Sequence, residues 1–94
     1  MSTKQLYQKE IEGKLEALDA QMAEMQAKVD KASADLKVQY YEQLRTLSER
    51  RETVQLKLQK LNQSGEAAWE TMKGGVENAY GELKQAFDKA VSQF

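Results

Sequence analysis

The chain has few side chains suited to acid–base or metal chemistry, because it contains neither histidine nor cysteine. Histidine is the commonest general base and, with cysteine, a preferred ligand for transition metals. The remaining candidates are two pairs of glutamates one helical turn apart, Glu12 with Glu16 and Glu66 with Glu70. Such a pair holds a divalent cation only when a shaped loop adds further oxygen ligands. We interpret both pairs as solvated, and expect a protein that is not an enzyme and has no metal and no cofactor.

The densest run of charge, residues 49–52, reads Glu-Arg-Arg-Glu. Two adjacent arginines can contact phosphate, but the flanking glutamates cancel their field, and we interpret the run as a solvated helix flank. Arg51 also falls on a predicted apolar seam, where an unpaired buried guanidinium is costly. We expect Arg51 to extend to solvent or to meet an acidic side chain of a neighbouring helix, and so to fix the helix register.

Three aromatic residues, Trp69, Tyr80 and Phe87, belong to an eleven-residue repeat that occupies residues 65–94: GEAAWETMKGG, VENAYGELKQA and FDKAVSQF. Eleven residues make three helical turns, so the repeat returns to one helix face and builds an apolar stripe. An aromatic stripe can face a ligand or a lipid surface, but aromatic residues at helical spacing more often lie in a core. We interpret this stripe as core.

The preceding part of the chain carries a different period. Over residues 11–36 apolar residues alternate at steps of four and three, which is the seam of a coiled coil. A stutter near Tyr40 relaxes this pattern before the heptad resumes and continues to Leu61. No glycine or proline lies between Lys14 and Leu61, and the pattern predicts one helix over about residues 4–61.

A turn at residues 62–65, Asn-Gln-Ser-Gly, is expected to separate this helix from a second one over about residues 66–94. The chain carries a net charge of −1. Its distribution is −2 over residues 1–27, +3 over residues 28–61 and −2 over residues 62–94. An acidic, basic, acidic order favours antiparallel packing of the middle segment against both ends.

We therefore predict an all-α fold: one helical coiled-coil domain, residues 1–94, with a long helix and a shorter antiparallel C-terminal helix that covers only half of it. A sharp bend near Ser33 would close three segments of nearly equal length into a bundle, but no typical loop residue occurs there. Two long antiparallel helices make the same contacts without bending, and we favour this domain-swapped homodimer. The predicted assembly interface comprises Leu15, Leu18, Met22, Met25, Val29, Leu36, Tyr40, Leu44, Leu47, Arg51, Val54, Leu58, Trp69, Met72, Val76, Tyr80, Leu83 and Phe87.

Composition also bears on partners and location. A net charge of −1 argues against nucleic acid as a partner, because no overall positive field recruits phosphate. The first ten residues lack the apolar segment of a signal peptide, and no stretch of eighteen apolar residues occurs. We expect a cytoplasmic homo-oligomer, with a further protein partner left open. Peripheral membrane contact is disfavoured because the acidic C-terminal segment would be repelled by anionic lipid.

The C-terminal part of the chain resembles a family of small, uncharacterised bacterial coiled-coil proteins. The likeness lies in Ser64-Gly65-Glu66-Ala67-Ala68-Trp69, in residues 73–77 (Lys-Gly-Gly-Val-Glu) and in residues 82–87 (Glu-Leu-Lys-Gln-Ala-Phe). The likeness reaches upstream to residues 41–44 and covers roughly the last sixty residues. It implies an architecture and no catalytic residues. The eleven-residue period is also similar to that of exchangeable apolipoproteins and late-embryogenesis-abundant proteins, as is any amphipathic helix of this period.

Two classes of function follow. The favoured class is a structural or interaction protein, a self-assembling helical module without a catalytic site. The alternative is an amphipathic helical protein that binds lipid surfaces or protects them under stress.

Overall fold

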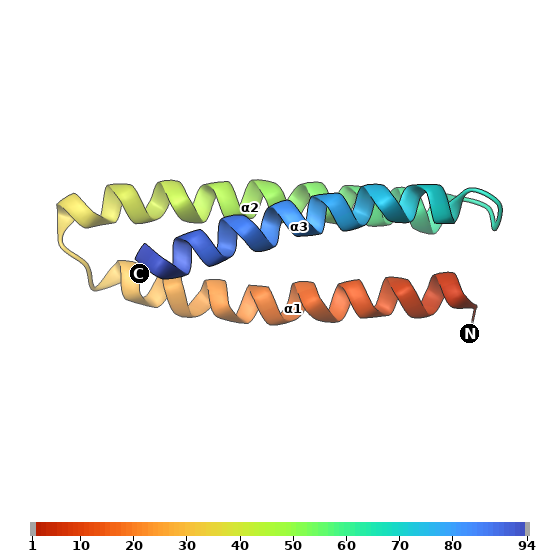
Figure 1. The fold of residues 1–94 in the computed structure, drawn as a ribbon. Coiled ribbons are helices and arrows are strands. Elements are labelled where there is room, and N and C mark those ends of the chain that lie inside the picture. Colours follow the sequence, from red (N-terminus) through yellow and green to blue (C-terminus); the bar gives the residue numbers. More distant parts are fainter. Residues whose placement is uncertain (1, 94) are drawn as a thin grey trace.

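The computed structural model describes residues 2–93, which form three α-helices and, within that range, no strand. Helix α1 spans Thr3–Asp30, α2 spans Ala34–Gln63 and α3 spans Trp69–Gln93. The chain reverses at each connection, so α1 and α3 run parallel to each other and antiparallel to α2 (Figure 1). The bundle is elongated, with dimensions of 51 × 19 × 18 Å. The predicted all-α fold is confirmed.

The first connection corrects the prediction of one helix over about residues 4–61. Lys31 keeps nearly helical angles (φ −98°, ψ −2°), but Ser33 is extended (φ −65°, ψ 160°) and starts α2 in the opposite direction. Most helical stability in proteins comes from packing of the apolar face, not from local propensity. The bend at residues 31–33 brings the apolar faces of α1 and α2 together within one chain, and this packing outweighs the local preference for helix.

The second connection lies at residues 64–68, later than the predicted turn at 62–65 and helix start at 66. The last two residues of α2 continue its helical hydrogen bonding, so the turn begins only at Ser64. The backbone N–H groups of Ala68 and Trp69 both donate to the carbonyl oxygen of Gly65, at 3.1 and 3.2 Å. This tight turn delays the start of α3 to Trp69.

The N-terminal end of α1 is held by a cap and by a contact with the end of α2. Ser2 caps α1 because its hydroxyl accepts from the Gln5 N–H at 3.2 Å, while the Gln5 side chain accepts from the Ser2 N–H at 3.1 Å. Lys4 reaches across to α2, where its Nζ donates to the Ser64 carbonyl oxygen at 2.8 Å. A cation at this position also matches the negative end of the α2 dipole.

A single apolar core runs along the bundle axis. All three helices contribute at steps of three and four residues, as amphipathic helices do. Its buried members are Tyr7, Ile11, Leu15, Leu18, Met25, Val29, Leu44, Leu47, Val54, Leu58, Leu61, Trp69, Val76, Ala79, Leu83, Phe87 and Ala90.

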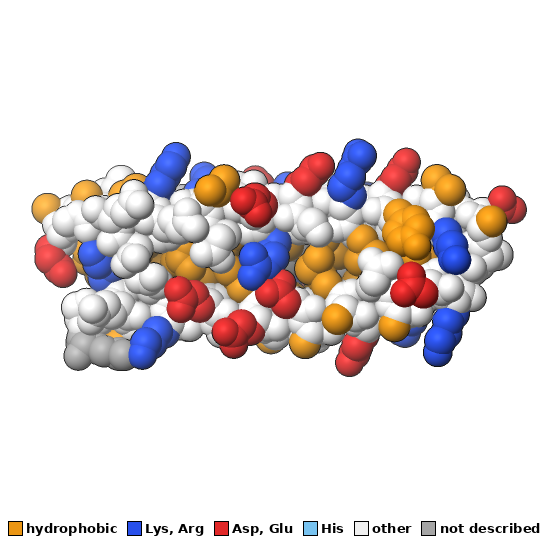
Figure 2. All heavy atoms as spheres, turned by 180° about the vertical axis from the view of Figure 1, so that it is seen from behind, with side chains coloured by type: hydrophobic (Ala, Val, Ile, Leu, Met, Phe, Trp, Pro, Cys, Tyr) orange, Lys and Arg blue, Asp and Glu red, His pale blue; other side chains and the backbone are white. Residues whose placement is uncertain are grey.

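The three seams between helices are unequal. α2 packs more closely against α3 than against α1, and α1 approaches α3 at few backbone positions. From the side opposite to Figure 1, apolar atoms are visible in the furrow between α1 and α2, flanked by charged side chains (Figure 2). α1 is therefore the helix held least closely by the rest of the chain.

Candidate functional site

Two adjacent arginines of α2 reach different neighbours near the middle of the bundle. Arg51 Nε and Nη2 donate to Asp19 Oδ1 and Oδ2 of α1 at 2.6 and 2.9 Å. Arg50 Nη1 lies 3.3 Å from Glu82 Oε2 of α3. Successive helical residues point about 100° apart, so one level of α2 contacts both flanking helices through its basic side chains.

The Arg51–Asp19 pair is the stronger of the two. It is bidentate, which adds geometric specificity to charge, and both side chains are partly shielded from water. The hydrogen bond that Arg51 donates to Asp19 raises the pKa of Arg51 further above its usual value. Arg51 thus meets an acidic residue of a neighbouring helix, which is one of the two arrangements expected at its seam position, and the pair fixes the register of α1 on α2.

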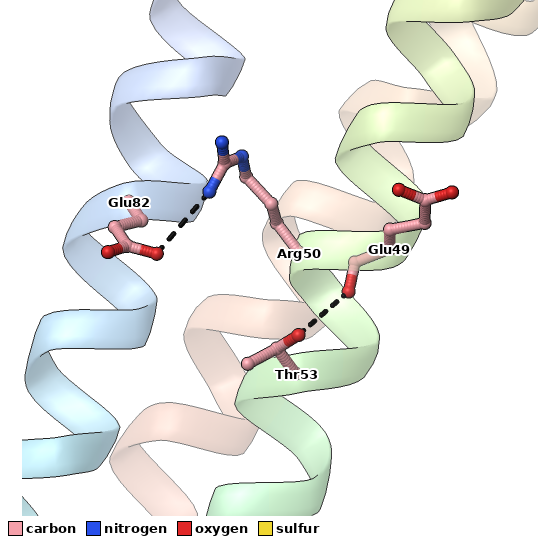
Figure 3. Close-up of polar contacts among 4 residues, drawn as sticks. All are labelled: Glu49, Arg50, Thr53 and Glu82. Atoms are coloured by element: carbon pink, nitrogen blue, oxygen red, sulfur yellow. Dashed lines mark hydrogen bonds and ion pairs between the residues drawn. The ribbon is translucent and has the colours of Figure 1, made fainter.

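The Arg50–Glu82 pair is more exposed, and Figure 3 shows how its neighbours lie. Glu49 directs its carboxylate away from this pair (Figure 3) and lies within 3.7 Å of Arg45 on the next turn. Exposed pairs of this kind contribute about 0–1 kcal/mol each. The basic run at residues 49–52 is thus engaged in pairs within the chain, which agrees with the interpretation as a helix flank.

Lysines over aromatic rings close the seam between α1 and α3. Lys73 Nζ of α3 lies 5.0 Å from the ring centroid of Tyr7 and 5.9 Å from that of Trp69. In return, Lys14 Nζ of α1 lies 5.4 Å from the ring centroid of Tyr80. The Tyr7 and Trp69 rings are tilted by 44° with centroids 6.3 Å apart. Each such cation–π contact contributes about 0.5–1 kcal/mol where it is exposed.

The phenolic hydroxyl of Tyr7 lies in a buried, largely apolar environment. It makes no hydrogen bond within the part of the chain that the structure describes. Burial, followed by the nearby charges of Glu77 and Glu10, raises the pKa of Tyr7 to about 12. The phenol is therefore neutral at physiological pH and contributes packing area without a polar contact.

A groove of about 570 Å³ lies between α2 and the C-terminal half of α3. Leu47, Ala86 and Ala90 line its apolar part, and the short alanine side chains leave it open. Its walls are mainly polar and include Gln43, whose Nε2 donates to Gln93. Small-molecule pockets are usually concave and mostly apolar, so this shallow groove with amide walls is a weak candidate for a ligand site.

The carboxylate pairs gain no additional ligands in the fold. Glu12 accepts a hydrogen bond from Gln8 of its own helix at 3.3 Å, and Glu66 lies in the exposed turn before α3. Among residues 2–93, no three acidic side chains gather into a group able to hold a metal ion. The helices described are also not apolar over a length sufficient to cross a membrane.

The end of the bundle near the first connection leaves core-facing apolar surface uncovered. Leu36 lies eight and eleven residues before the buried Leu44 and Leu47, hence on the same face of α2, yet it is 43% exposed. Tyr40, one turn further along α2, donates from its hydroxyl to the Gln93 carbonyl oxygen of α3 at 3.3 Å.

The predicted interface residues divide into three groups. The buried ones are Leu15, Leu18, Met25, Val29, Leu44, Leu47, Val54, Leu58, Trp69, Val76, Leu83 and Phe87. The half-buried ones are Met22, Tyr40, Arg51, Met72 and Tyr80, and Leu36 is exposed. The predicted interface omitted Tyr7, although its spacing from Ile11 and Leu15 extends the seam of α1 by one turn.

These contacts define a three-helix bundle over the described residues. No model of a known protein family, no curated protein and no solved structure matches this chain.

Proposed function

We propose that the chain is a structural or interaction protein, a self-assembling helical module whose partner is a second copy of itself. The observation that carries this proposal is Leu36, a core-facing residue that the single chain leaves 43% exposed. A compact end of a bundle would ordinarily cover such a position, and a second chain supplies the missing cover.

The proposed assembly is an antiparallel homodimer in which α1 is exchanged between chains. Each α1 would leave its own α2 and occupy the same place on the partner, so that Arg51 of one chain binds Asp19 of the other. Every contact between α1 and the rest of the bundle is then kept, and the exchange changes only the connection at residues 31–33. Because α1 is the least closely packed helix, it is the element that separates at the lowest cost.

The connection itself supports this exchange. Neither glycine nor proline occurs at residues 31–33, and none of the described residues has a positive φ. The Ser33 side chain makes no capping hydrogen bond to α2, so straightening the connection loses no such bond. A straight helix would also give the N–H groups of Ala34 and Asp35 the helical carbonyl partners that a first turn lacks.

The apolar stripe also stays in phase across the connection. Val29, Ala32, Leu36 and Tyr40 continue the three- and four-residue steps that precede and follow them. A loop has no need of this spacing, whereas a continuous helix through residues 31–33 requires it.

A charge-reversal experiment tests whether the Arg51–Asp19 contact joins two chains. Asp19→Arg places two cations at this contact, and Arg51→Asp places two anions there. In an exchanged dimer, mixing the two variants pairs opposite charges at both contacts, so heterodimers should form in preference to either homodimer. Native mass spectrometry of the mixture, after unfolding and refolding together, measures that preference.

The double variant Asp19→Arg/Arg51→Asp is the control, because it restores opposite charges in any arrangement and shows that both side chains are tolerated. A mixture in which each single variant stays equally destabilised, without heterodimers, would show that the contact is made within one chain. The proposed exchange would then be wrong.

A further inference from the structure

From the register of α1 on α2 we infer that the two chains of this dimer meet at Leu36, whose side chain packs against Leu36 of the second copy across the two-fold axis. The inference rests on the proposed exchange and adds to it the location of a contact that the closed chain lacks.

Two contacts far apart along the bundle determine the axis. In an antiparallel pair of identical helices, the two-fold axis passes through the midpoint of every pair of facing residues. Asp19 faces Arg51, and their midpoint in the sequence is residue 35. Lys4 reaches Ser64, and the midpoint of that pair is residue 34. Both contacts therefore place the axis one or two residues from Leu36.

The face of the helix selects Leu36 among the residues near this axis. Two neighbours in sequence, Asp35 and Lys37, are charged, and neither lies on the apolar stripe. Leu36 continues the apolar face of the buried Leu44 and Leu47. In the straightened helix this face meets the partner's helix, so the two Leu36 side chains oppose each other.

Burial explains why a leucine occupies this position. In the closed chain, the residues that would face Leu36 across the seam between α1 and α2 belong to the connection at residues 31–33. Covering the exposed part of a leucine side chain is favourable at about 25 cal/mol per Å² of apolar area. Leu36 is thus a seam position whose environment would differ between the closed chain and the exchanged dimer.

Cysteine cross-linking tests this contact directly, because the chain contains no native cysteine. Leu36→Cys should form an intermolecular disulfide severalfold faster than Val38→Cys under the same mild oxidation. Val38 is the matched control, since it is more exposed, at 62%, lies two residues away and points to the opposite side of α2. Nonreducing gels over a time course measure both rates, and sedimentation of each reduced variant gives its oligomeric state.

A second pair of variants tests the same contact without cysteine, in case the cysteine substitution itself weakens the dimer. Leu36→Glu would oppose two carboxylates at the axis and should raise the dimer dissociation constant by at least about tenfold, which corresponds to about 1.4 kcal/mol. Val38→Glu should leave that constant unchanged.

The outcomes separate the two proposals. A reduced protein that is dimeric, but cross-links equally at both positions and tolerates Leu36→Glu, would overturn the Leu36 contact and leave the exchange intact. A protein that stays monomeric at all concentrations would overturn both. Selective cross-linking at Leu36 together with selective disruption by Leu36→Glu supports the contact.

Discussion

Single side chains in this bundle contribute to its stability in different ways, some by apolar packing and some by polar contacts. Trp69 and Tyr7 contact each other at the seam of α1 and α3, and both are buried. Trp69 contributes apolar area in the core, whereas Tyr7 buries a hydroxyl that has no partner among the described residues. Substitutions at these two positions should therefore change stability in different directions.

Replacing Trp69 with alanine should strongly destabilise the fold. The indole is only 6% exposed, and removing a large buried aromatic side chain typically costs about 3–5 kcal/mol. Urea unfolding followed by circular dichroism measures the loss. Leu56→Ala is the control, because Leu56 is half exposed on α2 and its loss should change the unfolding free energy little. A Trp69→Ala protein as stable as the parent would mean that the indole lies in solvent, as a lipid-facing surface requires.

Replacing Tyr7 with phenylalanine should be neutral or stabilising at pH 7, because it removes a buried polar group that has no partner among the described residues.

The same substitution should also reduce the loss of stability at high pH. The pKa of Tyr7 is raised from 10.0 to about 12 in the folded chain, so the folded state resists ionisation that the unfolded chain accepts. Stability is thus complete below pH 10 and falls as pH rises toward 12. Unfolding free energies of Tyr7→Phe and the exposed control Tyr41→Phe, measured between pH 7 and 11, check this; equal alkaline slopes would contradict it.

At the scale of the helices, some features could be predicted from the sequence and others could not. The apolar stripe of α3 and the seam of α1 follow from their own periodicity. The seam position of Arg51 also follows from periodicity, which left open whether its side chain extends to solvent or meets an acidic residue. The identity of that residue, Asp19, depends on helix register, which periodicity alone leaves open. The turn after α2 was expected two residues early, because Asn62 and Gln63 favour turns locally but continue the helix here.

The break at residues 31–33 was the main error, and its cause is physical. Lys31, Ala32 and Ser33 accept helical geometry, so local sequence does not require a bend. Closed and exchanged arrangements share nearly all their contacts, which means that the apolar pattern does not distinguish them. Under the proposed exchange, the balance between the two arrangements would depend on the conformation of three residues and on protein concentration.

A longer, flexible connection should therefore shift the balance toward the closed chain. Inserting a glycine-rich loop between Lys31 and Asp35 prevents a continuous helix, because glycine costs about 1 kcal/mol per helical position relative to alanine. We expect a monomer with similar helical content, measured by sedimentation equilibrium and circular dichroism. Ser33→Ala is the opposite control and should strengthen the dimer. An assembly state indifferent to the insertion would show that the connection does not govern assembly.

At the scale of the whole molecule, the closed chain and the exchanged dimer differ most in length. The closed bundle is 51 Å long, whereas a helix continuous from residue 3 to residue 63 would extend about 90 Å at 1.5 Å per residue. Core composition, helical content and the ion pairs remain the same in both. Mass and length together are thus the properties that separate the two arrangements.

Small-angle X-ray scattering on material eluting from a sizing column tests the central claim most directly, since it gives mass and maximum dimension for the same species. For the parent chain at high micromolar concentration we predict twice the chain mass of 10.7 kDa and a maximum dimension of at least about 90 Å. A mass of 10.7 kDa with a maximum dimension near 51 Å would show that the chain stays closed and would contradict the account of a helix-exchanged module.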